Sequence, residues 1–182
     1  KSNLYNILAT LAAINSYVNI KNLKKDIFLD FKIPNGRGDI SKIKLKNKFF
    51  FLVDETYNSN PLSLKTAIEN YDKIELKDSK KYLILGDMLE LGKHTIKQHR
   101  LISKIVNKTK INQVHIIGKY IKETFKALKP NKKGKILTNR LSIIDLINKN
   151  LKNNDYLMIK GSNSTGLHKI TNDLKQRSSH AI

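Results

Sequence analysis

The sequence predicts an α/β protein whose main part is a Rossmann-like, mostly parallel sheet with helices on both faces. Two observations carry this prediction. The run from Phe49 to Val53 is apolar without alternation, which is typical of a strand covered on both faces of a parallel sheet. Similar runs then alternate with segments of helical periodicity to the end of the chain, and such alternation predicts parallel strands joined by right-handed crossovers.

The first part of the chain is expected to form a separate helical piece. Residues 3–18 and 22–31 place apolar side chains at helical spacing, which predicts two helices. Two helices cannot enclose a core, so we expect them to pack on another domain. A proline and two glycines follow and indicate a linker. The expected division is therefore residues 1–33 for the helical piece, 34–40 for the linker and 41–182 for the sheet domain.

The elements of the sheet domain can be assigned in order after the strand that ends at Val53. Asn60 is suited to cap the first helix and Pro61 to occupy its first position. The remaining predicted elements are strands at 82–87, 114–118, 135–138 and 155–162, with helices at 99–106, 119–128, 141–151 and the end of the chain.

Three strands of this pattern end in polar or glycine-containing turns, DETYNSNP, LGDMLELGKH and IKGSNSTGLHK. Because ligands bind at the carboxyl edge of open α/β sheets, we expect the three turns to share a site. Gly161 and Gly166 have the spacing of a phosphate loop, but Leu167 and His168 stand where its lysine and hydroxyl residue belong. The last turn either offers N–H groups and hydroxyls to an anion or is a plain tight turn.

Two charged residues are the main candidates for binding a nucleotide. The guanidinium of Arg37 suits phosphate oxygens, although an isolated linker arginine is usually only solvated. Asp54 stands at a strand end and could accept hydrogen bonds from ribose hydroxyls, with turn or helix capping as the alternative. The carboxylates of Glu55, Asp87 and Glu90 match no metal-ligand spacing, so no metal site and no catalytic residue is predicted.

Composition bounds the remaining function classes. The net charge of +20 invites a nucleic-acid interpretation, but the basic residues are scattered, nearly all are lysine, and no recognition module is present. A basic nucleic-acid-binding module therefore remains the alternative, and no specific nucleic-acid partner is expected. The chain has no cysteine, which excludes disulfides and thiolate metal sites. No apolar stretch approaches the roughly 18 residues of a membrane span, and we expect a cytoplasmic protein.

Five stretches in a fixed order resemble the Mur ligases, and among them the members that join D-alanyl-D-alanine to UDP-N-acetylmuramoyl-tripeptide. They are SNLYNILATLAA, PNGRGD, VDETYNSNPLSLKTAI, LILGDMLELGKH and LMIKGSNSTGLHKI. The resemblance covers the end of that family's central ATP-binding domain and its whole C-terminal domain, but not its phosphate loop. It implies a fragment that is inactive alone. A folylpolyglutamate synthase-like ligase is the alternative within the superfamily, and DETYNSNP argues against it.

The resemblance also implies roles for individual residues. Asn6 would recognise adenine, Arg37 would contact the phosphates of ATP, and Asp54 would hold the ribose. The residues implied to border the substrates are Tyr57, Asn58, Asn60, Lys160 and Ser162. The implied reaction uses ATP and Mg²⁺ and proceeds through an acyl phosphate on the tripeptide. The family's magnesium ligands cannot be located in this chain, and Asn163 stands where the family usually has an arginine.

Overall fold

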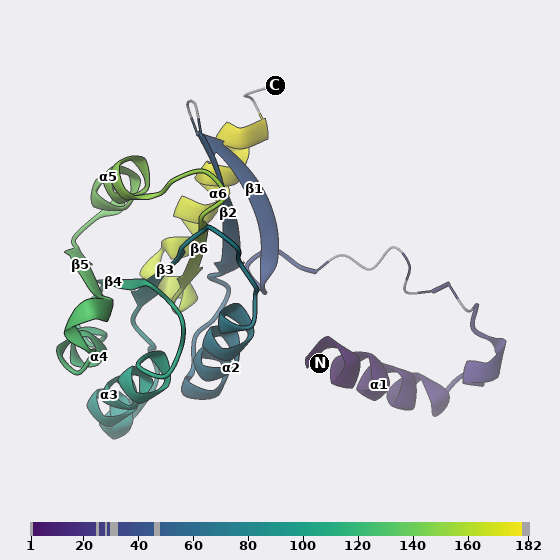
Figure 1. Cartoon of the computed structure of the whole chain (residues 1–182). Coiled ribbons are helices and arrows are strands. Elements are labelled where there is room, and N and C mark those ends of the chain that lie inside the picture. Colours follow the sequence, from purple (N-terminus) through teal and green to yellow (C-terminus); the bar gives the residue numbers. More distant parts are fainter. Residues whose placement is uncertain (1, 25, 28, 30–32, 46–47, 180–182) are drawn as a thin grey trace. The chain divides into compact units, whose positions relative to one another are not determined.

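A computed structural model describes residues 2–24, 26–27, 29, 33–45 and 48–179 of the chain (Figure 1). It divides into two compact units, residues 1–32 and residues 33–182, and each is described by itself. The division lies beside the predicted boundary at residue 33. The assignment of the first unit to a central domain remains a prediction.

The first unit contains one of the two predicted helices. Helix α1 (Ser2–Asn15) is followed by a single 3-10 turn, η1 (Ile20–Asn22). The helix predicted at 22–31 is wrong for the part of that stretch that the structure describes, where Asn22 ends η1 and the residues after it form no helix. Ile27 and Leu29 are 51% and 82% exposed, so no packing stabilises a helix this short. Phe31, which the prediction also used, lies outside the described residues.

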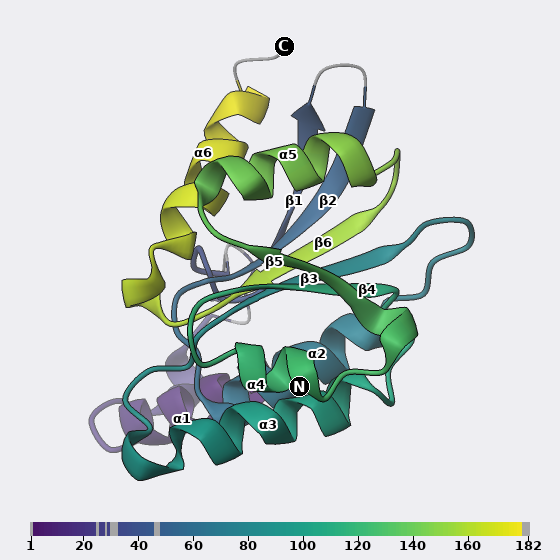
Figure 2. The ribbon, with the colours of Figure 1, turned by 90° about the vertical axis from the view of Figure 1, so that its left-hand side faces the viewer.

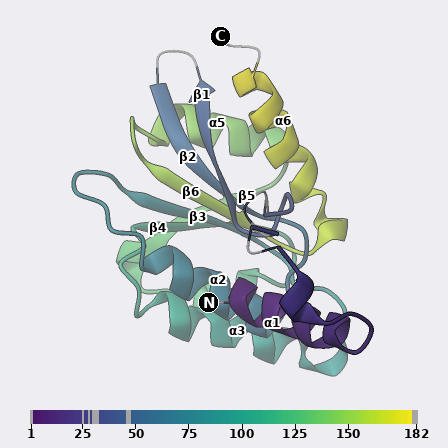
Figure 3. The same ribbon diagram turned by 90° about the vertical axis from the view of Figure 1, so that its right-hand side faces the viewer.

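The second unit is built on one six-stranded sheet, which confirms the predicted fold class. Its order is β1-β2-β6-β3-β4-β5, with β1 antiparallel to β2 and every other pair parallel (Figures 2 and 3). The strands are β1 (Asp39–Leu45), β2 (Lys48–Glu55), β3 (Lys81–Gly86), β4 (Gln113–Ile117), β5 (Lys133–Leu137) and β6 (Tyr156–Lys160).

Helices cover both faces of the sheet, as predicted. Helices α2, α3 and α4 lie on one face and α5 and α6 on the other (Figure 2). Their bounds are α2 (Pro61–Asp72), α3 (Thr95–Val106), α4 (Lys122–Lys126), α5 (Arg140–Asn150) and α6 (Leu167–Ser179), with 3-10 turns η2 (Gly92–His94), η3 (Pro130–Lys132) and η4 (Asn163–Thr165). The two faces carry separate cores because side chains alternate along each strand, with Val53 in one and Leu52 in the other.

The start of α2 forms as its sequence indicates. The Asn60 side chain accepts a hydrogen bond from Ser63 N–H, Ser63 Oγ accepts one from Asn60 N–H, and Pro61 occupies the first helical turn. The same capping box recurs at α5, between Asn139 and Ser142. Local side chains therefore fix where both helices begin.

The edge strand β1 has no counterpart among the predicted elements. It begins at Asp39, within the stretch for which a linker was expected, and pairs over its whole length with β2. Only Ile43 is fully buried in it, so its inward face is short and its outward face is rich in lysine. Such a strand resembles a polar loop in sequence, and lysines are common on exposed sheet edges.

Two lysines at the amino edge of the sheet donate hydrogen bonds to backbone carbonyls, one at a helix end and one in a loop. Lys48 Nζ donates to the carbonyls of Ile147 and Leu151 at 2.9 and 2.6 Å, at the end of α5. Lys132 Nζ donates to Thr109 and Ile111 at 2.7 and 2.8 Å, in the loop after α3. Lys48 therefore caps the end of α5, whereas Lys132 satisfies carbonyls of the loop after α3.

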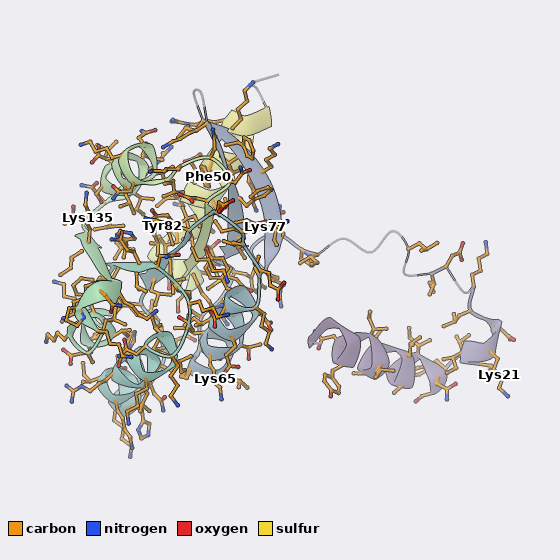
Figure 4. All side chains as sticks on the ribbon, in the orientation of Figure 1. Lys21, Phe50, Lys65, Lys77, Tyr82 and Lys135 are labelled. Atoms are coloured by element: carbon orange, nitrogen blue, oxygen red, sulfur yellow. The ribbon has the colours of Figure 1, made fainter. Side chains whose placement is uncertain are left out.

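Other lysines point outward from the same domain. Figure 4 labels Lys65 and Lys135 at the surface, and Phe50 and Tyr82 inside the domain, where both aromatic side chains are buried. Among the described residues, no helix has the length and apolar character that crossing a membrane requires.

Candidate functional site

The three polar turns meet at the carboxyl edge of the sheet, as predicted. They follow β2, β3 and β6, which are neighbours because β6 lies between the other two. Ser162 connects all three turns: its N–H donates to Asp87 O at 3.0 Å, its hydroxyl accepts from Leu89 N–H at 2.9 Å, and that hydroxyl donates to Ser59 O at 3.2 Å. Ser162 therefore holds the turns together as well as facing the site.

A cavity of about 500 Å³ opens between these turns. Three predicted substrate residues line it, namely Tyr57, Asn58 and Ser162. The other lining residues are Leu89, Glu90, Asn163, Ser164 and His168. Glu90 is the only carboxylate in this lining and has a positive φ of 63°, which is unfavourable for a residue with a side chain. Its only sequence signal was its place in the LGDMLELG turn.

Asn60 and Lys160 lie near the cavity without lining it. The Asn60 side chain is used in the capping box of α2. Lys160 is buried, and its ammonium donates to Asn58 O at 2.8 Å and lies 3.3 Å from Glu55 Oε2. Lys160 thus supports, from the interior of the domain, the turn that carries Tyr57 and Asn58.

In the Lys160–Glu55 ion pair, whose atoms are 3.3 Å apart, burial shifts both pKa values toward the neutral forms. Burial lowers the pKa of Lys160, and the attraction of Glu55 only partly opposes this. Burial likewise raises the pKa of the Glu55 carboxyl more than Lys160 lowers it. The pair is cross-strand, since Glu55 of β2 is in register with Lys160 of β6.

Asp54 faces the opposite side of β2 and is fully engaged. Its Oδ2 accepts from Lys175 Nζ of α6 at 2.6 Å, and its Oδ1 accepts from the Thr56 N–H and hydroxyl at 3.1 and 2.6 Å. Lys175 also pairs with Asp39 at 2.6 Å. Burial raises the pKa of Asp54, but the hydrogen bonds from Lys175 and Thr56 outweigh it and leave that pKa below its ordinary value.

The same network raises the pKa of Lys175. Burial acts to lower it, and the two carboxylates Asp39 and Asp54 together exceed that effect. Asp54 is only 1% exposed, so its carboxylate presents no free oxygen at the surface. The signal for this network was not legible in the sequence, because Lys175 lies in a helix at the far end of the chain.

Arg37 belongs to the sheet domain and is exposed there. Its guanidinium lies over the ring of Tyr57, with 4.1 Å between Cζ and the ring centroid. The two predicted residues, one for nucleotide and one for substrate, are therefore in contact. Asn6 lies in α1 of the first unit, where it is exposed.

Gly161 has a packing role at the end of β6. A Cβ there would lie 3.1 Å from the Cα of Gly86, at the end of β3, and 2.8 Å from the Leu167 side chain. The two glycines let neighbouring strand ends and the start of α6 approach closely. This supports the plain-turn interpretation of Gly161, while Gly166, with a φ of 74°, ends η4.

The carboxylates of this edge do not form a metal site. Asp87 accepts the N–H groups of Lys119, Tyr120 and Ile121, at 2.7 to 2.9 Å. Glu55 faces Lys160, which leaves Glu90 as a single carboxylate. Within the described part of the chain, no group of three histidine, aspartate or glutamate side chains could hold a metal ion. These residues therefore do not fit a resident Mg²⁺ ion.

Comparisons with known proteins agree with this architecture. A family model described as Mur ligase, glutamate ligase domain, matches residues 41–163. The UDP-N-acetylmuramoyl-tripeptide--D-alanyl-D-alanine ligase of Buchnera aphidicola subsp. Acyrthosiphon pisum (strain APS) is 32% identical over 97% of this chain and 37% of its own length. The ligase of the same name from Bacillus subtilis (strain 168) is 29% identical over 96% of this chain and 38% of its own length.

Solved structures show the same fold. The MurF ligase of Thermotoga maritima, crystallised in complex with ADP, has a TM-score of 0.72 at 21% identity and covers 98% of this chain and 39% of its own. The UDP-N-acetylmuramate-alanine ligase MurC of the same organism has a TM-score of 0.63 at 13% identity, over 96% of this chain and 38% of its own. The chain thus spans 37 to 38% of the length of the curated relatives named above. Since the family model matches more than half of its residues, the chain belongs to the Mur ligase family.

Proposed function

We propose that this chain is the C-terminal part of an ATP-dependent amide-bond ligase of peptidoglycan precursor synthesis. The reaction would add D-alanyl-D-alanine to UDP-N-acetylmuramoyl-tripeptide in the cytoplasm. One observation carries the proposal: relatives that bear this name align with 96 to 97% of the chain at 29 to 32% identity. The polar edge formed by three turns supports it, because ligands of open α/β sheets bind there.

The cavity suits the amine-bearing substrate. Its lining combines one carboxylate, Glu90, with hydroxyls, amides and the imidazole of His168. A zwitterionic dipeptide needs a negative partner for its ammonium group and hydrogen-bond donors for its carboxylate. We assign the ammonium group to Glu90 and the carboxylate to the wall formed by Ser162, Ser164 and His168.

The nucleotide roles in this proposal come from the family resemblance. The resemblance assigns the phosphates to Arg37, the adenine to Asn6 and the ribose to Asp54. A structural neighbour crystallised with ADP supports a nucleotide in this family. Because Asp54 already accepts from Lys175 and Thr56, a ribose contact at Asp54 requires the Lys175 ion pair to open.

The chain's own residues perform binding rather than chemistry in this proposal. ATP would phosphorylate the tripeptide carboxylate, and the dipeptide amine would then attack the acyl phosphate and release phosphate. When bound, Mg²⁺ would neutralise phosphate charge, but its ligands are not among the carboxylates of this edge. The cavity would orient the amine, and Arg37 would stabilise phosphate oxygens.

A chimaera tests the proposal directly. Residues 1–182 replace the matching 37% of the Buchnera aphidicola ligase, and phosphate release is measured with ATP, Mg²⁺, UDP-N-acetylmuramoyl-tripeptide and D-alanyl-D-alanine. We expect release that requires all three substrates and is strongly reduced by Arg37→Ala. The chain alone should release no phosphate, because it lacks the family's phosphate loop. A chimaera that unfolds cooperatively yet releases none, beside an active parent ligase, contradicts the proposal.

A further inference from the structure

The segment around Arg37 is fixed to the end of β2 by backbone hydrogen bonds. Gly36 O accepts from Tyr57 N–H at 3.1 Å, and Gly38 N–H donates to Asp54 O at 2.7 Å. Gly36 N–H donates to Asp39 Oδ1 at 2.8 Å. Anchors on both sides of Arg37 therefore set the direction in which its side chain leaves the backbone.

The close approach of the two segments requires glycine. Gly36 is buried with a φ of 77°, and a Cβ on it would lie 2.9 Å from the backbone nitrogen of Tyr57. Both the conformation and the space exclude a side chain there. The glycine thus brings the arginine segment into contact with the segment of Tyr57.

The guanidinium of Arg37 differs from those of Arg100 and Arg140, which form ion pairs. Arg100 pairs with Glu123 at 2.8 Å and Arg140 with Asp173 at 2.6 Å. Within the described part of the chain, the Arg37 guanidinium has no hydrogen bond or ion pair, and it lies over the Tyr57 ring. Its five N–H donors are therefore unengaged, while its plane is held on one side.

We propose that Tyr57 is a positioning residue that presents Arg37 to phosphate oxygens, rather than a residue that contacts the substrate itself. An aromatic ring attracts a guanidinium without neutralising it and without using its N–H donors. A carboxylate in the same place would compete with an incoming phosphate. The ring therefore lowers the conformational freedom of the side chain before the ligand arrives and leaves its charge available.

The ligand class is a group with phosphate oxygens, which could come from a nucleotide or from an inorganic source. A bidentate guanidinium recognises the oxygens in either case. This inference rests on the proposed function for the nucleotide as the source. The contact between Arg37 and Tyr57 and its effect on phosphate binding do not depend on it.

Nuclear magnetic resonance of the arginine Nε–H groups tests the contact in the 182-residue chain. The chain has only four arginines, so each signal can be assigned by substitution. The ring of Tyr57 should shift the Arg37 signal upfield, Tyr57→Leu should abolish that shift, and Tyr57→Phe should retain it. An Arg37 signal at the same position in the wild type and in Tyr57→Leu overturns the proposal.

Titration with tripolyphosphate and, separately, with ADP tests the consequence for binding. The Arg37 signal should report an affinity that falls about two- to fivefold in Tyr57→Leu and changes less than about twofold in Tyr57→Phe. The variant Arg37→Gln is the control, because the phosphate binding that remains in it comes from the other cations of the chain. Equal affinities in the wild type and Tyr57→Leu overturn the positioning role.

The two failures can be told apart. Tighter binding of ADP than of tripolyphosphate at Arg37 supports a nucleotide as the source of the phosphate. If ADP binds no better, the Arg37 site recognises phosphate alone. An inactive chimaera together with a Tyr57-dependent Arg37 affinity contradicts the ligase function and leaves the positioning role supported. An active chimaera with Tyr57-independent affinity does the reverse.

Discussion

Asp54 and Glu55 are consecutive residues at the end of β2, and each faces a lysine, yet their pKa values are shifted in opposite directions. Asp54 has a pKa below its ordinary value, and Lys175 has one above. Glu55 has a raised pKa, and Lys160 a lowered one. The difference lies in the contacts, since the Asp54 pair is 2.6 Å long and has further partners, whereas the Glu55 pair is 3.3 Å long.

The comparison shows that an ion pair in a low-dielectric site stabilises charge only when close hydrogen bonds offset desolvation. Asp54 has Thr56 as a second donor, and Lys175 has Asp39 as a second carboxylate. Lys160 instead donates its shortest hydrogen bond to a neutral carbonyl, that of Asn58. The first pair fastens α6 to the sheet, and the second supports the turn that lines the cavity.

The largest expected effect comes from breaking the close pair. Asp54→Ala should lower the free energy of unfolding by about 4 kcal/mol, because it removes a buried carboxylate and leaves Lys175 and Thr56 short of partners. Glu55→Ala should cost about 1 kcal/mol. Urea unfolding measures both, with Asp54→Asn as the control that retains an acceptor for Thr56. Equal losses in the two alanine variants would show that the pairs are equivalent.

The second largest effect is expected in the dependence of stability on pH, to which His115 should contribute most. Its pKa is lowered by burial, and secondarily by Lys135, from 6.5 to about 4. Between these values the unfolded chain binds the extra proton, so stability should fall by about 3 kcal/mol as the pH drops from 6.5 to 4. His115→Gln should flatten this part of the curve. A curve that keeps its slope in the variant would assign the acid sensitivity to other groups.

In the His115→Gln background, the two carboxylates should act with opposite signs. The lowered pKa of Asp54 contributes stability that is present above its unfolded value of 3.8 and is lost as the pH falls below it. The raised pKa of Glu55 does the reverse, so stability is gained as the pH falls through its folded value. Unfolding curves of Asp54→Asn and Glu55→Gln at several pH values should therefore deviate from their parent in opposite directions. Deviations of the same sign contradict the comparison.

Lys160→Met should have a smaller effect on stability than its burial suggests. Burial disfavours the ammonium group, and methionine fills a similar volume, so the expected loss is about 1 kcal/mol from the hydrogen bond to Asn58. The amide exchange of residues 57–60 should increase, while Lys175→Met, the matched control, should loosen α6 instead. Unchanged exchange in the 57–60 turn would remove Lys160 as its support.

The smallest effect on stability is expected at Arg37. Arg37→Gln removes only a contact with an exposed ring, so the free energy of unfolding should change by less than about 1 kcal/mol. Thermal unfolding of the two proteins in parallel checks this. A larger loss would mean that Arg37 is part of the structural network of Asp54 rather than a receptor.

The sequence was informative where the physics is local. Asn60 and Pro61 correctly predicted the start of α2, and the apolar run ending at Val53 correctly predicted a strand covered on both faces. Strand β1 was missed because its pairing with β2 depends on a partner strand rather than on its own lysine-rich pattern. The helix expected at 22–31 relied on spacing alone, and spacing does not stabilise a short segment without packing.

The candidate site shows the same limit. The turns could be placed at one edge, because parallel strands put their carboxyl ends together. The partners of Asp54 and Lys160 could not, since they are set by register and by a helix more than one hundred residues away. One feature could have been predicted. Because side chains alternate along a strand, Asp54 and Glu55 must lie on opposite faces of the sheet.

The two lysines that donate to backbone carbonyls at the amino edge of the sheet can report local opening of the domain. An amine whose protons are donated to carbonyls, as in Lys48 and Lys132, must leave them before it reacts with an acylating reagent. Its labelling rate then measures how often the end of α5, for Lys48, or the loop after α3, for Lys132, opens, while exposed lysines such as Lys65 label at once. Mass spectrometry of a labelling time course would thus show which of these two segments opens first.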